Sequence, residues 1–511
     1  MINIYEPNIK DYSSSAIDAI NSGWISNHGI YIMKSTNKLK DILNIKYSIL
    51  VANGTCATHC LFLSLKYKYP NIKKIYVPNN CYVAAWNCLL MEYPKKVMEI
   101  MKMDINTWNI DTSDEYIKNL DINSAVLIVH NLGNIINVPR LKRLRPDLIF
   151  LEDNCEGLFG KYENIYSGTS ESSLCSSISF YGNKIITTGE GGAFLTNNED
   201  IYNYILKVYS QGMSEERYIH DTHAYNYRMT NIQAAFLFDQ LNDLDNILTK
   251  KENIFNNYKI LLSNLIKDNK VQLFVNENNT ISTNWIFGLR IKDNKLSIKE
   301  TNDFFKDNNI DIRPFFYPIT THQHLSDLIY NDDIPHKLNN EIIMIPSSPN
   351  ISIEQQHIVI DYIEKFIFYV ENNIKIIEIN ENNNFYLKEF ISEITSDTFR
   401  YYQKRDITII KNHLLTIILL NNENKICGYA HIDNEDNKYW FGIYIYEKYQ
   451  NKGLGNKIMK YIFNYLKIKN INEIYLTVDN INTNAIKLYK KNNFNEILKN
   501  DKFILMNKYL I

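Results

Sequence analysis

The chain has 511 residues, of which 45% are hydrophobic and 22% charged, and its formal net charge is -2 at pH 7. This length predicts two or three domains, each able to bury a substantial core. Because the net charge is near neutral and the basic stretches are short and scattered, the sequence gives no electrostatic reason to expect nucleic acid or an anionic membrane as a partner.

No segment of the sequence is typical of export or membrane insertion. The first residues, MINIYEPNIKDYSSS, lack a basic stretch followed by an apolar one, and apolar runs such as LLTIILL are too short to span a bilayer. The seven cysteines are spread over the chain without a pair of C-x2-C motifs. We therefore expect a cytoplasmic protein with reduced thiols and no membrane partner.

The predicted elements fall into two groups along the chain. Through about residue 370, short β-branched runs such as KKIYVPN, SAVLIVHN and DLIFLED alternate with longer amphipathic stretches. This alternation predicts an α/β fold with a mainly parallel sheet and crossover helices. The asparagine-rich stretch ENNIKIIEINENNN then leads into a new series of elements, so we expect domains at 1–372 and 376–511.

The segment VANGTCATHC predicts a strand that ends at Asn53-Gly54 and a helix that starts near Thr55. Exposed amides of Thr55 and Cys56 at this helix start favour an anion such as phosphate, helped by the helix dipole. The same kind of loop also occurs without a ligand.

A metal site is not predicted. The nearest approach to a cluster is Cys56, His59 and Cys60 in GTCATHC, where helical spacing would place two thiols on one face. We interpret them as buried thiols on a helix rather than as metal ligands.

A lysine and a carboxylate farther along the chain suggest a cofactor. Lys184 lies between a strand-like run and a glycine cluster in SISFYGNKIITTGEGGAFLTN, and Asp153 follows the apolar run DLIFLE. A lysine can hold the aldehyde of pyridoxal phosphate as a Schiff base, and a carboxylate can keep the ring nitrogen protonated. Because most lysines have plain surface or loop roles, the pair rather than Lys184 alone indicates this cofactor.

Four separated segments resemble one family in their order: VANGTCATHC, LEDNCEGLFG, FYGNKIITTGEGG and HAYNYRMTNIQAAFLFDQL. On these segments the first 370 or so residues resemble the DegT family of pyridoxal-phosphate sugar aminotransferases. GNKIITTGEGG and YNYRMTNIQAA are most similar to enzymes that aminate C4 of nucleotide-linked 4-keto-6-deoxy sugars. Dehydratases of the family carry histidine at the lysine position, so Lys184 favours transamination. The resemblance implies an aspartate-aminotransferase-like fold (fold type I) with large and small subdomains.

The resemblance also implies roles for individual residues. It adds the hydroxyl of Ser179 to Gly54, Thr55 and Cys56 as donors to the cofactor phosphate, and it makes Lys184 catalytic. Without the resemblance, a glycine- and threonine-containing turn of this kind would not be assigned a ligand.

Three further residues are placed near the cofactor by the same resemblance. Tyr82 would lie flat on the pyridine ring, although as a strand-end tyrosine it would otherwise be assigned to the core. Glu156 would lie near the phenolic oxygen, where glutamate is familiar in the perosamine-type subgroup. Asn226 would reach the phosphate of the neighbouring subunit, which implies a homodimer with shared sites; asparagine in a loop is otherwise a turn former.

The second group of elements contains a Q-x-x-G-x-G pattern formed by Gln450, Gly453 and Gly455, between the strand-like FGIYIY and a helix. Small residues at a helix start let backbone amides approach a pyrophosphate. With the later segment EIYLTVDNINTNAIKLYKKNNF, this region resembles the acetyl-CoA-binding core of the GNAT acetyltransferases, an α+β domain. Asparagine replaces glycine in the usual G-F ending at Asn493-Phe494.

The GNAT resemblance implies that Tyr489 is the general acid that protonates the departing thiolate and that Asn482 contacts the CoA arm. The plain alternatives are that Tyr489 packs its helix and Asn482 caps it. No base is identifiable, because His431 and Glu447 are interpreted as ordinary strand or surface residues.

Together the two resemblances predict a bifunctional enzyme that uses pyridoxal 5'-phosphate and acetyl-CoA. L-Glutamate would aminate a nucleotide-linked 4-keto-6-deoxy sugar, and the second domain would acetylate the new amine. We favour UDP-linked 4-keto-6-deoxy-N-acetylglucosamine and a bacillosamine-type product, while GDP-perosamine and dTDP- or UDP-viosamine chemistry stays open. Amination at C3, an unrelated amine as the acetyl acceptor, and a second domain that only binds a ligand also stay open.

Overall fold

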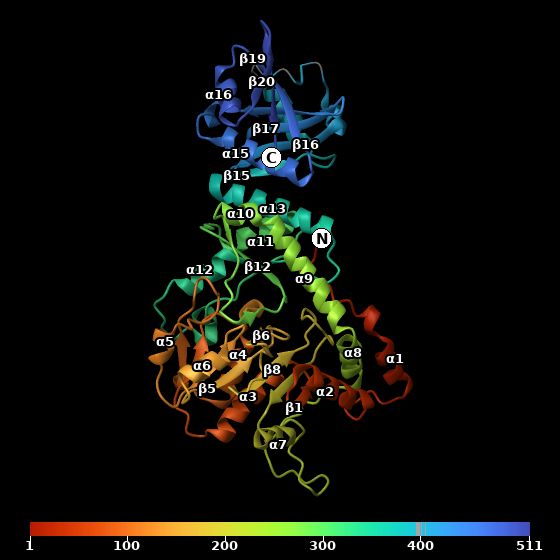
Figure 1. Cartoon of the computed structure of the whole chain (residues 1–511), viewed down its shortest axis with the longest axis vertical. Coiled ribbons are helices and arrows are strands. Elements are labelled where there is room, and N and C mark those ends of the chain that lie inside the picture. The colour runs from red at the N-terminus through yellow and green to blue at the C-terminus, as the bar shows by residue number, and fades with distance from the viewer. Residues whose placement is uncertain (395–398, 400, 404, 511) are drawn as a thin grey trace. The chain divides into compact units, whose positions relative to one another are not determined.

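The computed structural model describes residues 1–394, 399, 401–403 and 405–510. The chain divides into two compact units, unit 1 (Met1–Val359) and unit 2 (Ile360–Ile511), and the division falls within helix α13 (Ile353–Asn372) (Figure 1). Within the described residues, no helix has both the length and the apolar character needed to cross a bilayer.

A seven-stranded sheet forms the centre of unit 1, in the order β1-β9-β8-β5-β4-β2-β3. Neighbouring strands are parallel except at β9, which is antiparallel to both β1 and β8. The predicted mainly parallel α/β sheet is therefore confirmed. The strands are β1 (Tyr47–Val51), β2 (Ile75–Pro78), β3 (Met98–Met101), β4 (Ala125–Val129), β5 (Ile149–Asp153), β8 (Ser173–Ser179) and β9 (Gly192–Thr196).

The sequence of the central strands explains their position. Every residue of β4, AVLIV, is buried, and its alternate side chains enter two different cores. Leu127 and Val129 pack in the core that contains helix α3 (Gly54–Lys68), whereas Val126 and Ile128 pack in the opposite one. A continuous apolar run is typical of a parallel strand that is covered on both faces, because the pleat sends successive side chains to opposite sides.

Helices connect these strands and cover the sheet (Figure 1). Helix α3 packs on β8 and β9, and α8 packs on α1 and α2. The other helices of unit 1 are α1 (Ser14–Asn21), α2 (Ile30–Leu43), α4 (Ala84–Glu92), α5 (Asp114–Lys118), α6 (Val138–Leu144), α7 (Glu199–Val208), α8 (Asn231–Asn242), α9 (Leu244–Leu261), α10 (Ser263–Lys267), α11 (Ile298–Asp307) and α12 (Ile334–Glu341).

Two smaller antiparallel sheets complete unit 1. One has the order β10-β12-β14-β13, from β10 (Val271–Gln272), β12 (Phe287–Ile291), β13 (Arg313–Pro314) and β14 (Ile342–Ile345). The other joins β6 (Lys161–Tyr162), β7 (Ile165–Tyr166) and β11 (Thr280–Ile281).

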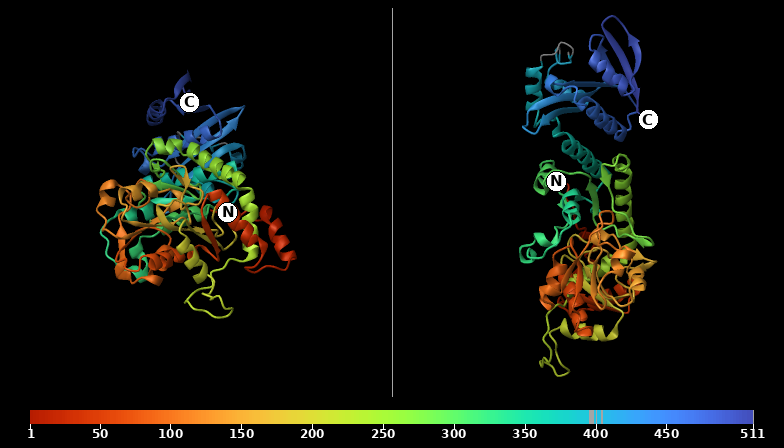
Figure 2. Two further views of the ribbon diagram at one scale, coloured as in Figure 1. Left: turned by 60° about the horizontal axis from the view of Figure 1, so that its bottom comes forward. Right: turned by 90° about the vertical axis from the view of Figure 1, so that its left-hand side faces the viewer.

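A hairpin between α7 and α8 extends away from the rest of unit 1 in every view (Figures 1 and 2). Antiparallel bridges join Ser210 to Asn226 and Met213 to His220. At its base, Arg228 bridges to Val51 of β1, so the hairpin starts beside the turn between β1 and α3.

Unit 2 contains a second seven-stranded sheet, in the order β15-β16-β17-β18-β19-β21-β20. Only β18 and β19 are parallel, and their ladder is the single pair Trp440–Tyr475. The two strands therefore separate beyond that pair. The elements are β15 (Ile374–Glu378), α14 (Phe385–Glu393), β16 (His413–Asn421), β17 (Ile426–Glu435), β18 (Lys438–Ile445), α15 (Leu454–Ile468), β19 (Glu473–Asp479), α16 (Thr483–Lys491), β20 (Asn495–Lys499) and β21 (Phe503–Tyr509).

Candidate active sites

The predicted cofactor residues of unit 1 come together at one edge of its sheet. Asp153 is the last residue of β5 and Ser179 the last of β8, while Gly54 begins α3 just after β1. Because β1, β5 and β8 run in the same direction, their carboxyl ends meet there, and ligands of open α/β sheets bind at this edge. The fold thus gathers residues that are more than 120 positions apart in the chain.

Gly54 and Ser179 are in direct contact. A Cβ atom added to Gly54 would lie 2.7 Å from Ser179 Cβ and 2.9 Å from Ser179 Oγ, so a side chain does not fit. The hydroxyl of Ser179 therefore lies against the first turn of α3, where free amides and the helix dipole favour an anion. This contact is compatible with a phosphate group shared by the two elements.

The start of α3 is capped by Asn53, whose Oδ1 accepts a hydrogen bond of 2.9 Å from the amide of Cys56. An anion would have to share or displace this bond in order to use the Cys56 amide. Thr55 is exposed at the same turn. The phosphate roles of Thr55 and Cys56 stay predictions.

Asp153 is held at the end of β5 with 7% of its surface exposed. Its Oδ1 accepts hydrogen bonds from the Cys155 amide at 3.2 Å and from Ser177 Oγ at 3.3 Å. Its Oδ2 lies 3.4 Å from Thr58 Oγ1 on α3. These long bonds leave the carboxylate able to accept a stronger donor, such as a protonated ring nitrogen.

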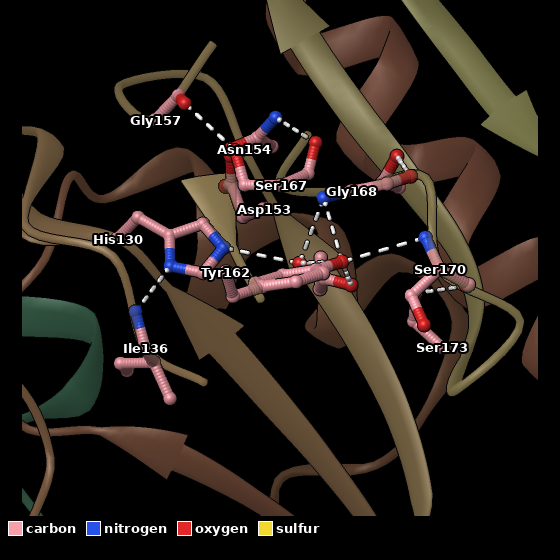
Figure 3. Close-up of polar contacts among 12 residues, drawn as sticks. His130, Ile136, Asp153, Asn154, Gly157, Tyr162, Ser167, Gly168, Ser170 and Ser173 are labelled. Carbon is pink, nitrogen blue, oxygen red and sulfur yellow. Dashed lines mark hydrogen bonds and ion pairs between the residues drawn. The ribbon is translucent and has the colours of Figure 1, made fainter. Parts of the chain in front are cut away.

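A fully buried polar network holds the neighbouring residue, Glu152, whose side chain points to the opposite face of β5 because successive strand residues alternate. Its partners His130, Tyr162 and Gly168 are labelled in Figure 3. Its carboxylate accepts hydrogen bonds from His130 Nε2 and Tyr162 Oη, both at 3.1 Å, and from the Gly168 amide at 3.0 Å. His130 Nδ1 accepts from the Ile136 amide, so the ring hydrogen lies on Nε2. The network fixes the end of β5 and so positions Asp153.

Lys184 lies close to the buried Trp285 and the half-buried Tyr5. Its Nζ is 3.8 Å from the centre of the Trp285 ring, a cation–π arrangement. Trp285 is itself fixed, because its Nε1 donates 2.8 Å to the Asn183 carbonyl and its own carbonyl accepts 2.7 Å from Lys251 Nζ. The hydroxyl of Tyr5 donates to the carbonyl of Lys184.

Glu156 is buried near Lys184, and both its burial and the lysine charge act on its carboxyl. Burial raises the pKa of its carboxyl to about 7, while the charge of Lys184 opposes that rise. The amide of Leu132 donates 2.8 Å to Oε2. Leu132 has a φ of 50°, a conformation that an L-residue adopts rarely, so the donor is presented by a strained turn.

Tyr82 and Asn226 are both on the surface of the single chain. Tyr82 is 61% exposed, which rules out the alternative of a core tyrosine, and its ring meets Phe316 edge-on at 6.5 Å. Asn226 is exposed in the hairpin, between Tyr225 and Tyr227. Tyr227 is anchored to His59 Nδ1 at 2.9 Å, and the two tyrosine rings stack at 4.9 Å, so Asn226 faces away from this anchor.

His59 is therefore part of a structural contact. Its Nε2 also lies 3.0 Å from Glu92 Oε1, so both ring nitrogens are engaged. Cys60 is buried and Cys56 half-buried, as expected for thiols on a packed helix. Across the described part of the chain, no group of three or more His, Cys, Asp and Glu residues is arranged to hold a metal ion.

In unit 2, the predicted pyrophosphate loop lies between β18 and α15. Gly453 precedes the helix with a φ of 79° and open space around it, which suits glycine. A Cβ on Gly455 would lie 2.9 Å from Leu488 of α16, so this glycine lets the two helices approach. Gln450 Nε2 donates 2.8 Å to the Ile445 carbonyl and thereby closes the loop.

The side chains predicted on α16 have defined contacts. Asn482 caps the helix, since its Oδ1 accepts from the Ala485 amide at 3.1 Å. Tyr489 is buried against Phe441 of β18 and Phe494, with ring centres 6.5 and 5.7 Å away. Burial raises the pKa of Tyr489, which keeps its hydroxyl protonated. The capping and packing alternatives thus describe real contacts, and the roles toward CoA stay predictions.

Sequence reasoning missed Trp285 and Tyr5, which touch Lys184 from distant parts of the chain. No local pattern marks either residue, because their relation to Lys184 comes from the packing of separate elements. Sequence reasoning also treated His431 as an ordinary strand or surface residue, although it is buried in a cluster of titratable side chains.

The sequence matches the DegT/DnrJ/EryC1/StrS aminotransferase family over residues 8–364 and the acetyltransferase (GNAT) family over residues 379–494. It is 32% identical to a GDP-perosamine synthase of Escherichia coli O157:H7 over 71% of this chain and 98% of that protein. It is 30% identical to the GDP-perosamine synthase of Vibrio cholerae, over 70% of this chain and 96% of that protein.

Solved structures agree on the fold. A GDP-4-keto-6-deoxy-D-mannose-3-dehydratase of E. coli with bound hydrated PLP covers 71% of this chain and 99% of its own, with a TM-score of 0.63 at 21% identity. The match with a Helicobacter pylori aminotransferase involved in the biosynthesis of pseudoaminic acid covers 72% of this chain and 99% of that chain, with a TM-score of 0.63 at 19% identity.

The two family matches confirm the predicted classes of activity and cofactor. DegT-family aminotransferases use pyridoxal 5'-phosphate, and GNAT domains use acetyl-CoA, so the chain combines a sugar transaminase with an N-acetyltransferase domain. The chain therefore belongs to the DegT/DnrJ/EryC1/StrS aminotransferase family and carries a domain of the GNAT acetyltransferase family after its aminotransferase part.

Proposed function

We propose that the chain transfers an amino group from L-glutamate to C4 of a GDP-linked 4-keto-6-deoxy sugar and then acetylates the new amine. The single observation that carries the first step is the meeting of Lys184, Glu156, Asp153, Ser179 and Gly54 at one edge of the unit 1 sheet. Residues 1–372 would form the aminotransferase domain and 376–511 the acetyltransferase domain.

The residues of unit 1 fit pyridoxal 5'-phosphate. Gly54 and Ser179 form a narrow contact at a helix start that suits the phosphate, and Asp153 is a buried carboxylate with weak hydrogen bonds that suits the ring nitrogen. Tyr82 has an exposed ring available for stacking. When bound, this cofactor supplies an aldehyde that a lysine can hold and a ring that withdraws electrons from the substrate carbon.

The side chains of the chain itself handle the protons. Lys184 Nζ would carry a proton to and from the reacting carbon, and the Trp285 ring 3.8 Å away would hold the ammonium form. With a pKa of about 7, the carboxyl of Glu156 can exist in both protonation states near neutral pH. Glu156 would therefore exchange a proton with the phenolic oxygen of the cofactor, near which the family resemblance places it, as the charge of Lys184 changes.

The acetylation step follows from the chemical relation of the two domains. The aminotransferase product is a primary amine, which is the group that an N-acetyltransferase consumes. In unit 2 the separating strands β18 and β19 and the glycine turn before α15 are compatible with an acyl-CoA. Gln450, Gly453, Gly455 and Asn482 would bind the CoA arm, and Tyr489 would protonate the thiolate.

The relatives support a GDP-linked substrate over the UDP-linked sugar favoured from sequence. Two relatives at 30% identity or more, matched over nearly their full lengths, are GDP-perosamine synthases. A UDP-4-amino-4,6-dideoxy-N-acetyl-beta-L-altrosamine transaminase of Campylobacter jejuni is 25% identical over 50% of this chain. The UDP-linked sugar is therefore the second candidate.

A homodimer would complete the aminotransferase site. The exposed hairpin, the outward position of Asn226 and the 61% exposure of Tyr82 are what a shared site requires, since a partner would cover them.

Product analysis tests the proposal directly. The purified chain is offered GDP-, dTDP- and UDP-linked 4-keto-6-deoxy sugars with glutamate, with and without acetyl-CoA, and products are identified by mass spectrometry. We expect a GDP-linked amino sugar without acetyl-CoA and its acetamide with it. An amino sugar that stays free in the presence of acetyl-CoA would contradict the acetylation step.

A further inference from the structure

A cluster of titratable side chains that the chemistry above does not use lies on one face of the unit 2 sheet. It consists of Tyr401, His413 at the start of β16, and His431 and Asp433 on β17. We call these four residues the histidine cluster. His431 and Asp433 are 3% and 4% exposed, so two ionisable groups are withdrawn from water.

Three members of the histidine cluster are linked by hydrogen bonds. Tyr401 Oη donates to Asp433 Oδ2 at 2.6 Å and lies 2.6 Å from His413 Nε2. His413 Nδ1 lies 2.6 Å from Thr416 Oγ1. Because Tyr401 Oη gives its hydrogen to Asp433, His413 Nε2 donates to Tyr401 Oη. His413 Nδ1 then accepts a hydrogen bond from Thr416 Oγ1.

His431 differs from its neighbour. Its ring stacks on His413 with centres 4.9 Å apart and lies 4.1 Å from the Tyr401 ring. Its Nδ1 is buried and has no hydrogen-bond partner among the described residues. A buried polar atom without a partner is costly, so a group that binds in the working enzyme and donates a hydrogen to this nitrogen would be stabilised there.

The unpartnered nitrogen lies against strand β18. A Cβ added to Gly442 would be 2.7 Å from His431 Nδ1 and closer still to its Cε1, so the imidazole occupies the space that a side chain would fill. Glycine at this position thus allows the ring to rest on the backbone of β18.

Tyr489 approaches the same stretch of β18 from the other side. It contacts the ring of Phe441, the residue before Gly442, and successive strand residues point to opposite faces of a sheet. The pair Trp440–Tyr475, where β18 and β19 part, comes one residue earlier. The predicted acid and the unpartnered imidazole therefore flank the opening between the strands.

We propose that His431 is the proton acceptor of the acetyl transfer, a role that rests on the proposed function of unit 2. The neutral amine attacks the thioester carbonyl beside Gly442, and an N–C bond forms while the C–S bond breaks. The proton leaves the nitrogen for His431 Nδ1, and the thiolate takes a proton from Tyr489. The products are the acetamide and CoA, and solvent returns the two proton carriers to their starting states.

The surroundings keep His431 in the form that can accept a proton. Burial is the main cause that lowers the pKa of His431, and the positive charge of Arg405 acts in the same direction. Burial likewise lowers the pKa of His413 to about 4, opposed by Asp433. A neutral imidazole suits the intermediate, whose positively charged nitrogen is a strong acid.

The first test compares His431→Gln with Tyr402→Phe in the full chain. Tyr402 shares a 2.8 Å hydrogen bond with Tyr429 beside the cluster, so its variant removes a buried polar group without removing the base. We expect His431→Gln to slow acetamide formation about a hundredfold or more, with unchanged CoA binding and amination, and Tyr402→Phe to slow it little. Imidazole added to His431→Ala should restore part of the rate. Parental rates in His431→Gln would overturn the proposal.

The second test does not depend on the identity of the amine. Bromoacetyl-CoA carries an alkylating carbon where acetyl-CoA has its acetyl group, and loss of bromide joins that carbon to a nearby nucleophile. Peptide mapping should find the label on His431, and Tyr402→Phe should leave labelling unchanged. Label found solely on other residues would overturn the placement of His431, even if the sugar proposed above is wrong.

Discussion

In unit 1 the proposed cofactor site lies where parallel strands end, whereas in unit 2 the histidine cluster lies on the face of a largely antiparallel sheet. Asp153 and Ser179 are terminal residues of β5 and β8, and Lys184 follows β8 by a short loop. His431 lies inside β17 and is positioned by cross-strand contacts with β16 and β18.

This difference decides how each site can be recognised. Loops after strand ends need particular backbone shapes, so the residues around Lys184 form a contiguous motif with glycines and threonines. For a side chain inside a strand, the sequence pattern indicates only that the side chain faces the core. The base proposed for unit 2 therefore required the sheet register, while the lysine of unit 1 did not.

The largest expected effect concerns Lys184. Lys184→Ala should lower amino-sugar formation by about a thousandfold or more, because it removes both the covalent anchor and the proton carrier. Acetylation of a supplied amino sugar should not change, since the two units carry separate chemistry. Borohydride should attach the cofactor to a peptide that contains Lys184 in the parent.

Lys299→Ala, on an exposed helix surface, is the matched control and should behave like the parent. Cofactor fixed by borohydride to a different lysine would contradict the assignment of Lys184.

The next effect concerns the acid in unit 2. Tyr489→Phe should slow acetylation about a hundredfold to ten-thousandfold if the hydroxyl protonates the thiolate, and should leave amination unchanged. Tyr461→Phe removes another buried hydroxyl of unit 2, one that donates 3.0 Å to Asp361, and serves as the control. In a coupled assay the free amino sugar should accumulate only with Tyr489→Phe. If the two variants acetylate at equal rates while the chemical step limits the rate, Tyr489 has only a packing role.

A smaller effect on stability is expected at Glu156. Burial raises its pKa from 4.5 to about 7, so the folded state prefers the protonated acid, and the stabilisation that this preference provides is lost as pH rises through about 7. Glu156→Gln should therefore raise the free energy of unfolding of the cofactor-free chain at about pH 8, by at most about 3 kcal/mol. The gain should shrink as the pH falls toward about 5.

Urea unfolding at the two pH values measures this gain. Glu163→Gln is the control of opposite sign, because Arg143 lowers the pKa of Glu163 and its carboxylate should stabilise the folded state at alkaline pH. A gain at Glu156 that is the same at both pH values would contradict the electrostatic origin.

The smallest expected change tests the shared site. Lys184→Ala and Asn226→Ala subunits are each expected to be impaired, and mixing them should restore activity in heterodimers with one of two sites intact. Mixing Lys184→Ala with itself is the control. Subunits that demonstrably exchange without any recovery would show that Asn226 serves its own chain.

Much of unit 1 was predictable because its signals are local. The apolar runs DLIFLED and SAVLIVHN became β5 and β4, and the helix predicted to start near Thr55 begins at Gly54. The 61% exposure of Tyr82 did not follow from its own sequence context, which is typical of a core residue, and the family resemblance predicted only that its ring would stack on the cofactor.

The sequence by itself determined the fold class and the approximate positions of strands and helix starts, because these depend on residues that are neighbours along the chain. The exact ends differ: the strand predicted to end at Asn53-Gly54 ends at Val51. Only the tertiary structure decided that Trp285 lies under Lys184 and that His431 rests on Gly442. Such contacts join residues from separate elements, and a one-residue shift in strand register would turn His431 to the other face of its sheet. Packing and register, which no short segment encodes, therefore decide which polar atoms are left to bind a substrate.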